Sequence, residues 1–414
     1  MGSASENPQI GAEELLPGLP DALTIEHIST RVPWGKLYAL SKTWRHAIRS
    51  GQVYEARFRA NTCRTLVAMI HCSPTQKPRT SLYDEYEEFH EFLPHILPFF
   101  DQSLSLYNPA ADTWYSLPPI PDVDVGIPHN CELVYLKNRG KLYLLGGGDE
   151  ASNTGSRKQV YVLDLWSKQD GWKRCADMST PRERFSSGVM NGKVYVFGGE
   201  CHRRLFRPPE WCAAEMYDPE EDVWTPIAPM LHASAEEVLV VDEALTLDGF
   251  FLVRGHFEGH YEGPLKEPVV ERRFVEIYNP YKDQWGKLER DINTFGPGTH
   301  MMTVDGNFYF FEKNHVIRYD FRTRTPSSQI NSLKIIDEAR KLDDGHVCTA
   351  APAGDGEVLT LHKWPRNQWS HWNQAAILLK SKGLGSKTCS LQWEKVSCGC
   401  EFDTDYTRMC VVKI

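Results

Sequence analysis

The sequence predicts a mostly β chain, built from repeated four-stranded antiparallel units and preceded by a small helical domain. Three observations lead to this prediction. An aromatic residue is followed by a tryptophan seven positions later in three places, a hairpin signal precedes a strand and a diglycine in two, and short amphipathic segments occupy the chain before residue 60. The chain has 414 residues, 41% of them hydrophobic and 24% charged, which is enough for two packed domains.

The clearest repeat unit runs from residue 191 to residue 224. Asn191-Gly192 suits a two-residue hairpin turn with positive φ at both central residues. Lys193 to Phe197 is rich in β-branched and aromatic residues and predicts a strand that Gly198-Gly199 ends. Cys212 to Tyr217 predicts the next strand, and Trp224 follows it after a polar turn. Such a unit cannot bury its own faces, so it predicts neighbours of the same kind.

Copies of this unit recur along the chain. The turn-plus-tryptophan element is repeated as Tyr107 with Trp114, Tyr217 with Trp224 and Tyr278 with Trp285, and Tyr161 with Trp172 is a stretched version. At the spacing of these tryptophans, residues 66–414 hold six units. Residues 408–414 predict a final strand that pairs beside Leu66 to Ile70. This pairing would close a ring and remove its free strand edge.

The diglycine strands, the Tyr-Asp-Pro and Trp elements, and the stretch Pro181 to Phe185 resemble kelch repeats. Kelch repeats form the blades of a β-propeller. The resemblance covers residues 64–414 and implies a six-bladed kelch β-propeller, with the C-terminal strand closing the first blade. The alternative is an unrelated β-sandwich whose turns coincide by chance.

The segment before the repeats predicts three short helices. Residues 1–13 are polar, so we expect a disordered tail. Asp21 can cap a helix that Pro33 ends. A second helix continues to Gly51, and a third follows it. The apolar positions that define the three helical faces are Ile25, Ile28 and Val32, then Leu37, Leu40, Trp44 and Ile48, then Tyr54 and Phe58.

Three short helices directly before such repeats resemble an F-box, here over residues 14–60, and the wording Leu-Pro-Gly-Leu-Pro-Asp is that of plant F-box/kelch proteins. The interval from Pro33 to Trp44 is shorter than the family pattern, which leaves the strength of adaptor binding open. The alternative is a helical cap on the propeller with a private core. The resemblance implies that an adaptor is bound by Leu16, Pro17, Leu19, Pro20, Leu23, Ile28, Val32, Pro33, Leu40 and Trp44.

Composition and charge exclude several classes of function. The net charge of −9 argues against nonspecific binding to nucleic acid or to anionic membranes. No stretch of about 18 apolar residues predicts a membrane span, and no secretory signal is visible at the N-terminus. The 11 cysteines are irregularly spaced, which predicts reduced thiols and a cytoplasmic or nuclear location.

Candidate chemical sites are weak, so we expect no enzyme, no cofactor and no metal. Gly146 to Gly148 is followed by a strand, whereas a phosphate-binding loop needs a helix N-terminus. His256 and His260 lie in a glycine-rich loop without further ligands, and Cys398 and Cys400 are too crowded for a zinc site. A kelch-propeller oxidase would need paired tyrosines and histidines, which the sequence does not match.

Arginines and aromatic residues gather in the loops after the diglycine strands and after the tryptophan strands, which open on one face of a propeller. The arginine fork suits carboxylates and phosphates, and arginine with aromatic residues is typical of interface anchors. The other interpretation is ordinary solvated loop charge. The predicted target-binding face consists of Arg182, Arg184, Arg203, Arg204, Arg207, Phe257 and Tyr261.

The resemblances together imply a substrate-recognition subunit of an SCF-type ubiquitin ligase. Its helical domain would dock a Skp-type adaptor and, through it, a cullin. Its propeller would bind a target protein that presents acidic side chains or a phosphorylated segment. The alternative is a kelch interaction scaffold without any link to a ligase.

Overall fold

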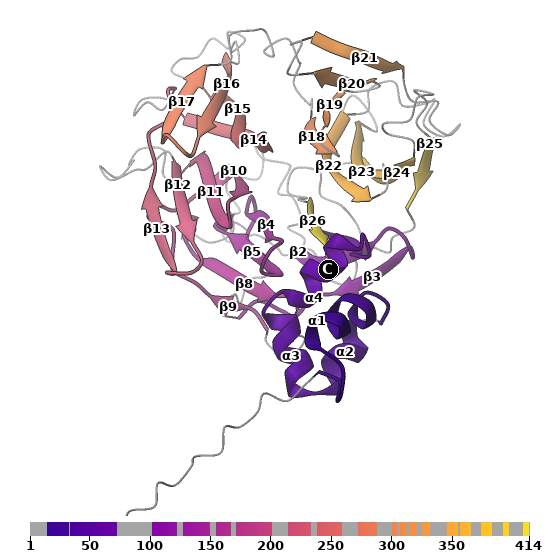
Figure 1. The fold of residues 1–414 in the computed structure, drawn as a ribbon. Helices are drawn as coiled ribbons and strands as arrows, with labels where there is room; N and C mark the ends of the chain where they lie inside the picture. Colours follow the sequence, from indigo (N-terminus) through magenta and orange to yellow (C-terminus); the bar gives the residue numbers. More distant parts are fainter. Residues whose placement is uncertain are drawn as a thin grey trace, which may run out of the picture.

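Strands dominate the described residues, and the helices among these residues precede residue 60 (Figure 1). The computed structural model describes residues 15–32, 34–72, 102–121, 127–149, 155–166, 171–200, 214–232, 238–258, 272–287, 300–304, 307–312, 315–320, 325–331, 346–354, 357–365, 374–382, 392–396 and 409–413. The predicted tail at residues 1–13 lies outside these ranges. None of the helices in these ranges is long and apolar enough to cross a membrane.

The helical unit contains one more helix break than the sequence predicts. Ser41 has extended backbone angles (φ −155°, ψ 171°), and its hydroxyl accepts a hydrogen bond from the Trp44 N–H at 3.2 Å. Because this serine caps a new helix, the predicted single helix across Leu37 to Ile48 is wrong. The elements are α1 (Asp21–Leu23), the π-helical turn η1 (Thr24–Ser29), α2 (Trp34–Leu40), α3 (Lys42–Arg49) and α4 (Gln52–Arg59).

Asp21 does not cap the first helix as predicted. Pro20 occupies the N-cap position and makes no side-chain cap. The Asp21 carboxylate instead accepts a hydrogen bond from the Leu15 N–H at 2.9 Å. This contact folds the apolar lead segment back onto the helical unit.

Six four-stranded antiparallel sheets form the blades of a ring in the described part of the chain (Figure 1). The predicted fold, with six blades, is confirmed. The first three blades, written from the inner to the outer strand, are β26 (Met409–Lys413), β1 (Thr65–Cys72), β2 (Gln102–Asn108) and β3 (Thr113–Ser116); β4 (Glu132–Leu136), β5 (Lys141–Leu145), β8 (Val160–Asp164) and β9 (Lys173–Arg174); and β10 (Glu183–Met190), β11 (Lys193–Glu200), β12 (Ala214–Asp218) and β13 (Val223–Pro226).

The other three blades repeat the same strand order, and a two-stranded ribbon decorates the second blade. The ribbon consists of β6 (Gly148–Asp149) and β7 (Gly155–Ser156). The remaining blades are β14 (Val238–Leu247), β15 (Phe250–Glu258), β16 (Arg272–Asn279) and β17 (Gln284–Lys287); β18 (His300–Val304), β19 (Asn307–Glu312), β20 (His315–Asp320) and β21 (Thr325–Asn331); and β22 (His346–Gly354), β23 (Glu357–Pro365), β24 (Gln374–Lys382) and β25 (Gln392–Lys395).

The ring is closed by the strand near the C-terminus. The innermost strand of each blade contacts that of the next, in the order β26, β4, β10, β14, β18, β22 and back to β26. β26 pairs antiparallel with β1 from Thr65↔Lys413 to Met69↔Met409, so the predicted pairing is confirmed. The Tyr135 hydroxyl of the second blade donates a hydrogen bond to the Lys413 carbonyl at 2.5 Å.

The hairpin and diglycine signals of the third blade have different outcomes. Asn191 and Gly192 have φ of 52° and 76°, which confirms the predicted turn with two positive φ angles. The diglycine does not end the strand. β11 continues through Gly198, which pairs with Phe185, to Glu200, which pairs with Glu183.

The repeated Tyr…Trp element is a clamp between blades. In the third blade, Asp222 has φ of 54°, and its carboxylate oxygen accepts from the Tyr217 hydroxyl at 2.7 Å and from the Ala176 N–H at 2.9 Å. The Trp224 indole N–H donates to the Ala176 carbonyl at 2.9 Å. Ala176 follows the outer strand of the second blade, so the turn of one blade holds the exit of the preceding one. The fourth blade repeats the arrangement with Tyr278, Asp283 and Trp285 on Ala228.

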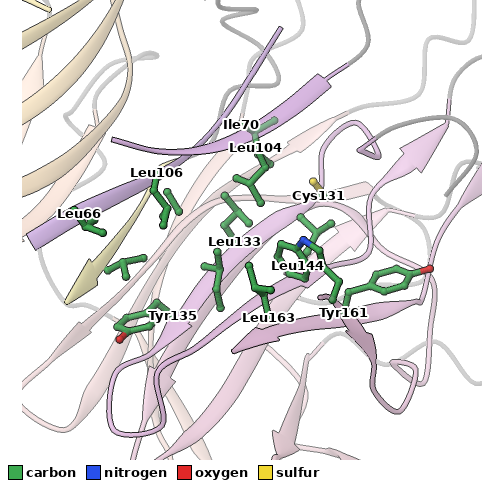
Figure 2. Packing of buried hydrophobic residues seen from close by; sticks show 14 residues of the cluster. Leu66, Ile70, Leu104, Leu106, Cys131, Leu133, Tyr135, Leu144, Tyr161 and Leu163 are labelled. Atoms are coloured by element: carbon green, nitrogen blue, oxygen red, sulfur yellow. The ribbon is translucent and has the colours of Figure 1, made fainter. Parts of the chain in front are cut away.

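The hydrophobic cores lie between blades. In Figure 2, Leu66, Leu104 and Leu106 from the first blade face Leu133 and Leu163 from the second. Comparable clusters join the second blade to the third, the third to the fourth and the sixth to the first. Each blade therefore buries its two faces only when both neighbours are present.

Candidate protein-interaction surfaces

The two ends of the blades carry different connections. The hairpins between first and second strands and between third and fourth strands open at one end, here called the hairpin face. The connections between second and third strands, and those to the next blade, open at the opposite end, here called the loop face. Residues 137–140, 191–192, 219–222 and 248–249 lie on the hairpin face; residues 146–149, 155–159 and 227–232 lie on the loop face.

The helical unit sits on the hairpin face, and three leucines among the predicted adaptor residues are exposed on it. The Lys137 Nζ atom, in the hairpin between β4 and β5, lies over the ring of Phe58 on α4, 5.9 Å from the ring centroid. Leu19, Leu23 and Leu40 are 46%, 49% and 60% exposed. These three leucines are here called the exposed leucines. Large apolar side chains left in water on so small a unit make it a candidate binding surface.

The other predicted adaptor residues differ in exposure. Pro17 and Pro20 are exposed and Leu16 is half-buried. Ile28 and Val32 are half-buried and pack against the core of the helical unit. Pro33 lies outside the described residues.

Trp44 is a core residue of the helical unit. Its side chain is 1% exposed, and its indole N–H donates to the Leu15 carbonyl at 3.1 Å. The prediction that Trp44 contacts the adaptor directly is therefore wrong, because the ring is enclosed by its own unit. Trp44 acts on the exposed leucines indirectly, because it stabilises the helical unit that presents them.

Arg57 is a buried cation that the sequence analysis missed. Its Nε–H donates to the Ser29 carbonyl at 3.0 Å, and Nη2 donates to the Val32 carbonyl. Burial lowers the pKa of the guanidinium from its usual value. The side chain thus satisfies carbonyls at the end of η1 and ties that turn to α4.

Arg182 is fully buried, so its predicted role in target binding is wrong. Arg182 and Glu215 are both 0% exposed. The Arg182 Nε and Nη2 atoms donate to one Glu215 oxygen at 3.1 and 2.9 Å, and the Ser179 N–H donates to the other at 2.9 Å. An unpaired charge would be very costly at such a site. The arginine therefore belongs to the interior of the third blade.

Phe257 is also buried, and its predicted role in target binding is wrong. It lies in the core between the third and fourth blades, 5.5 Å from Phe274 and 5.9 Å from His232, measured between ring centroids.

Glu276 accepts from the N–H groups of Leu231 and His232 at 3.0 and 2.9 Å. Glu276 thus does in the fourth blade what Glu215 does in the third: it holds the connection from the preceding blade.

Arg184 is the predicted target-face arginine that the structure describes as partly accessible. It lies at the loop-face end of β10, is half-buried and has φ of 54°. A left-handed backbone is uncommon for so large a side chain, and such conformations concentrate at functional sites. Arg203, Arg204, Arg207 and Tyr261 lie outside the described residues.

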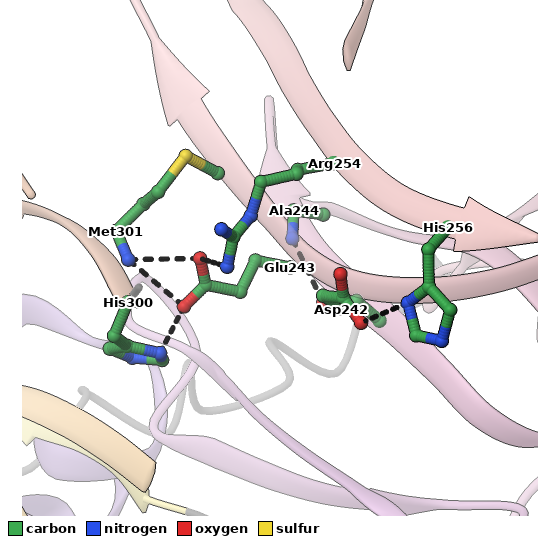
Figure 3. A network of polar contacts seen from close by, with 8 residues as sticks. Asp242, Glu243, Ala244, Arg254, His256, His300 and Met301 are labelled. Carbon is green, nitrogen blue, oxygen red and sulfur yellow. Dashed lines mark hydrogen bonds and ion pairs between the residues drawn. The ribbon is translucent and has the colours of Figure 1, made fainter. Parts of the chain in front are cut away.

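A polar network joins the fourth and fifth blades at the inner strands (Figure 3). A β-bulge separates Val241 from Glu243 in β14. The Glu243 carboxylate accepts from Arg254 at 3.1 Å and from the Met301 N–H at 2.9 and 3.1 Å, and it also contacts His300. The sequence contains no evident signal for this bulge. The described residues contain no group of His, Cys, Asp and Glu placed to hold a metal.

Comparisons with known proteins identify one kelch motif and several homologues. The kelch motif matches residues 181–231. Several F-box/kelch-repeat proteins of Arabidopsis thaliana are homologues of this chain. One is 28% identical over 67% of this chain and 65% of its own length. SKIP30 is 30% identical over 55% and 58%, and SKIP20 is 28% identical over 67% and 66%.

This chain thus matches less than two thirds of the length of each of these relatives. Among solved structures, "Structure of YjhT" is 15% identical over 67% of this chain and 85% of that chain, with a TM-score of 0.45.

Proposed function

We propose that this chain, a homologue of Arabidopsis F-box/kelch-repeat proteins, is the substrate-recognition subunit of an SCF-type ubiquitin ligase. The helical unit docks a Skp-type adaptor and, through it, a cullin. The propeller binds the target protein at its loop face. The chain recognises and does not catalyse: it contributes by holding two macromolecules close together.

The observation that carries this proposal is the exposure of three leucines on a unit that sits opposite the loop face. Complete burial of a leucine side chain is worth about 1.5–3 kcal/mol. With 46%, 49% and 60% of these side chains exposed, an adaptor that covers them gains roughly 2–5 kcal/mol. Because the helical unit sits on the hairpin face, it does not cover the loop face, where a second partner would bind.

We propose that the target presents acidic side chains or a phosphorylated segment. Arg184 at the loop face, together with Arg203, Arg204 and Arg207 in the connection after β11, supports this choice. Contacts between charges at a protein surface are screened over about 8 Å at physiological ionic strength, so target binding should weaken as salt rises. The same proposal places the chain in the cytoplasm or nucleus.

The adaptor surface is tested by changing Leu23 or Leu40 to Asp in the full chain and measuring adaptor binding. A charge placed in an apolar contact should weaken binding by at least about tenfold, which corresponds to about 1.4 kcal/mol. Leu231→Asp is the matched control, because Leu231 is 48% exposed but lies on the loop face. Wild-type adaptor affinity in both Leu23→Asp and Leu40→Asp would contradict the assignment.

The alternative is an interaction scaffold without a ligase partner. It predicts that the wild-type chain captures its target and binds no Skp-type adaptor. A single affinity purification that detects adaptor and target together separates the two functions.

A further inference from the structure

The second blade departs from the repeat at its outer turn. In the third blade Lys193 Nζ pairs with Asp218 at 3.0 Å, and in the second blade Lys141 Nζ pairs with Asp164 at 2.8 Å, so the two aspartates are equivalent. Trp224 follows Asp218 by six positions, whereas Trp172 follows Asp164 by eight. The second blade therefore carries two additional residues in this turn.

The longer turn places a tryptophan in the helical unit. Trp166 is 1% exposed and belongs to the core cluster of the helices. Its ring centroid lies 5.3 Å from that of Tyr54 on α4. The propeller thus contributes a buried aromatic ring to the core of another unit, while Trp172 of the same turn stays in the core between the first two blades.

The backbone on both sides leaves room for this indole. Gly140 in the hairpin between β4 and β5 has φ of 62°, and a Cβ there would lie 2.3 Å from the Trp166 ring. On the helical side, a Cβ at Gly51 would lie 3.3 Å from the same ring. The Leu165 N–H donates to the Gly140 carbonyl at 2.9 Å, and the Trp166 N–H donates to the Asp164 carboxylate at 2.9 Å. The ring is therefore held between the hairpin and the start of α4.

Without a second contact, the covalent connection would restrain the orientation of the helical unit on the propeller less tightly. α4 ends at Arg59 and β1 begins at Thr65, so residues 60–64 form the link. A second attachment away from this link removes rotation about it. Trp166 supplies that attachment, and Lys137 near the Phe58 ring adds to it.

We propose that Trp166 is a positioning residue that locks the helical unit and the propeller into one relative orientation. The lock itself involves only this chain and needs no partner. Its consequence for ubiquitin transfer rests on the proposed function. A fixed orientation holds the exposed leucines and the loop face at a constant separation. Transfer to a bound target depends on such positioning, because proximity contributes only when the geometry is maintained.

The lock is tested by distance measurements in the full chain. Probes on genetically introduced ketone amino acids at Lys42 of α3 and Glu220 of the hairpin face, both exposed, report the separation between the units. Trp166→Ala should broaden the distance distribution at unchanged helix content by circular dichroism, and Trp166→Phe should retain most of the narrow distribution. Gly140→Ala disrupts the same contact from the propeller side and should also broaden it.

Trp224→Ala is the control, because Trp224 is the third-blade counterpart of Trp172 and packs in the core between the second and third blades, not in the core of the helical unit. It should lower propeller stability and leave the distance distribution narrow. Narrow distributions in both Trp166→Ala and Gly140→Ala would overturn the proposal.

The functional consequence has a separate readout. With adaptor and target both at saturating concentrations, so that a change in either affinity does not affect the rate, Trp166→Ala should slow ubiquitin transfer. An unchanged transfer rate beside a broadened distance distribution would overturn the positioning role. Failure of the wild-type chain to bind an adaptor would instead overturn the proposed function, and the distance measurement would still decide whether the lock exists.

Discussion

Replacing Glu215 with Gln should destabilise the propeller strongly without touching its surface. The substitution keeps the shape of the side chain and an oxygen that can accept from Ser179. It removes the negative charge opposite Arg182, whose guanidinium is 0% exposed. The arginine then remains as a buried cation without its counter-ion, a change that typically costs about 3–5 kcal/mol.

The expected shift in melting temperature follows from domain size. Unfolding entropy is about 2.1 cal/mol/K per residue near 60 °C, which gives roughly 0.7 kcal/mol/K for a propeller of roughly 350 residues. A loss of about 3–5 kcal/mol therefore lowers the melting temperature by about 4–7 °C. Scanning calorimetry of the full chain measures this shift directly.

A double variant separates the charge effect from general damage. Arg182→Met combined with Glu215→Gln removes the cation as well, so the double variant should melt at a higher temperature than Glu215→Gln alone. If Glu215→Gln melted within about 1 °C of wild type, a cost below ~1 kcal/mol, the buried pair would not carry the energy assigned to it. Changing Arg182 to an acidic residue would also abolish target binding, but the cause would be unfolding of the third blade.

Three further predictions concern the ring and the helical unit. Deleting residues 409–414 removes β26 and exposes the edge of β1, so the melting temperature should fall; an unchanged value by calorimetry would show that closure is made elsewhere. Trp44→Ala should cost about 3–5 kcal/mol and abolish adaptor co-purification, while hydrogen exchange in β11 stays at the wild-type rate; retained adaptor binding would refute it. Burial, and secondarily Cys63, raises the pKa of Tyr54 from 10.0 to about 12, so its contribution to stability is complete below pH 10 and is lost as the pH rises through 12. The buried Tyr54 hydroxyl has no hydrogen-bond partner among the described residues, so Tyr54→Phe should be at least as stable as wild type at pH 7. In urea titrations between pH 10 and 12, Tyr54→Phe should lose less stability than wild type. An equal loss of stability in the two proteins would contradict this.

The repeat architecture could be predicted because it is local. The hairpin at Asn191-Gly192 and the interval from Tyr217 to Trp224 are encoded within a few residues, and their recurrence indicates the blades. The fifth and sixth blades, whose repeat elements are weaker, were predicted from the spacing of the tryptophans. The outer strand of the sixth blade, β25, contains Trp393, a further copy of the outer-strand tryptophan that the sequence analysis overlooked.

The target face could not be predicted residue by residue, because burial depends on partners far away in the chain. Arg182 meets Glu215 only when β12 is in register, 33 residues later. Arg184, two positions on, is half-buried and has a left-handed backbone with φ of 54°. Composition identified a cationic cluster, and only three-dimensional pairing separates the buried Arg182 from the partly accessible Arg184.

The helical unit shows the same limit. Apolar spacing correctly marked Leu37, Trp44 and Ile48 as buried, but it also placed Leu40 on that face. The break at Ser41 turns α3 relative to α2, and Leu40 is left exposed. A single serine hydroxyl thus decides which leucine is available to a partner.

The clamps between blades also set the order in which stabilising contacts become available during synthesis. Ala176 bonds to Asp222 and Trp224, 46 and 48 residues later, so a nascent chain completes this contact soon after the repeat emerges. The first blade differs, because β1 must wait for β26, and the Tyr135 hydroxyl waits across 278 residues for the Lys413 carbonyl. Contacts so distant in sequence form slowly, and an unpaired strand edge is open to foreign strands in the meantime. We therefore expect the edge of β1 to be the part of the nascent chain that most needs a chaperone.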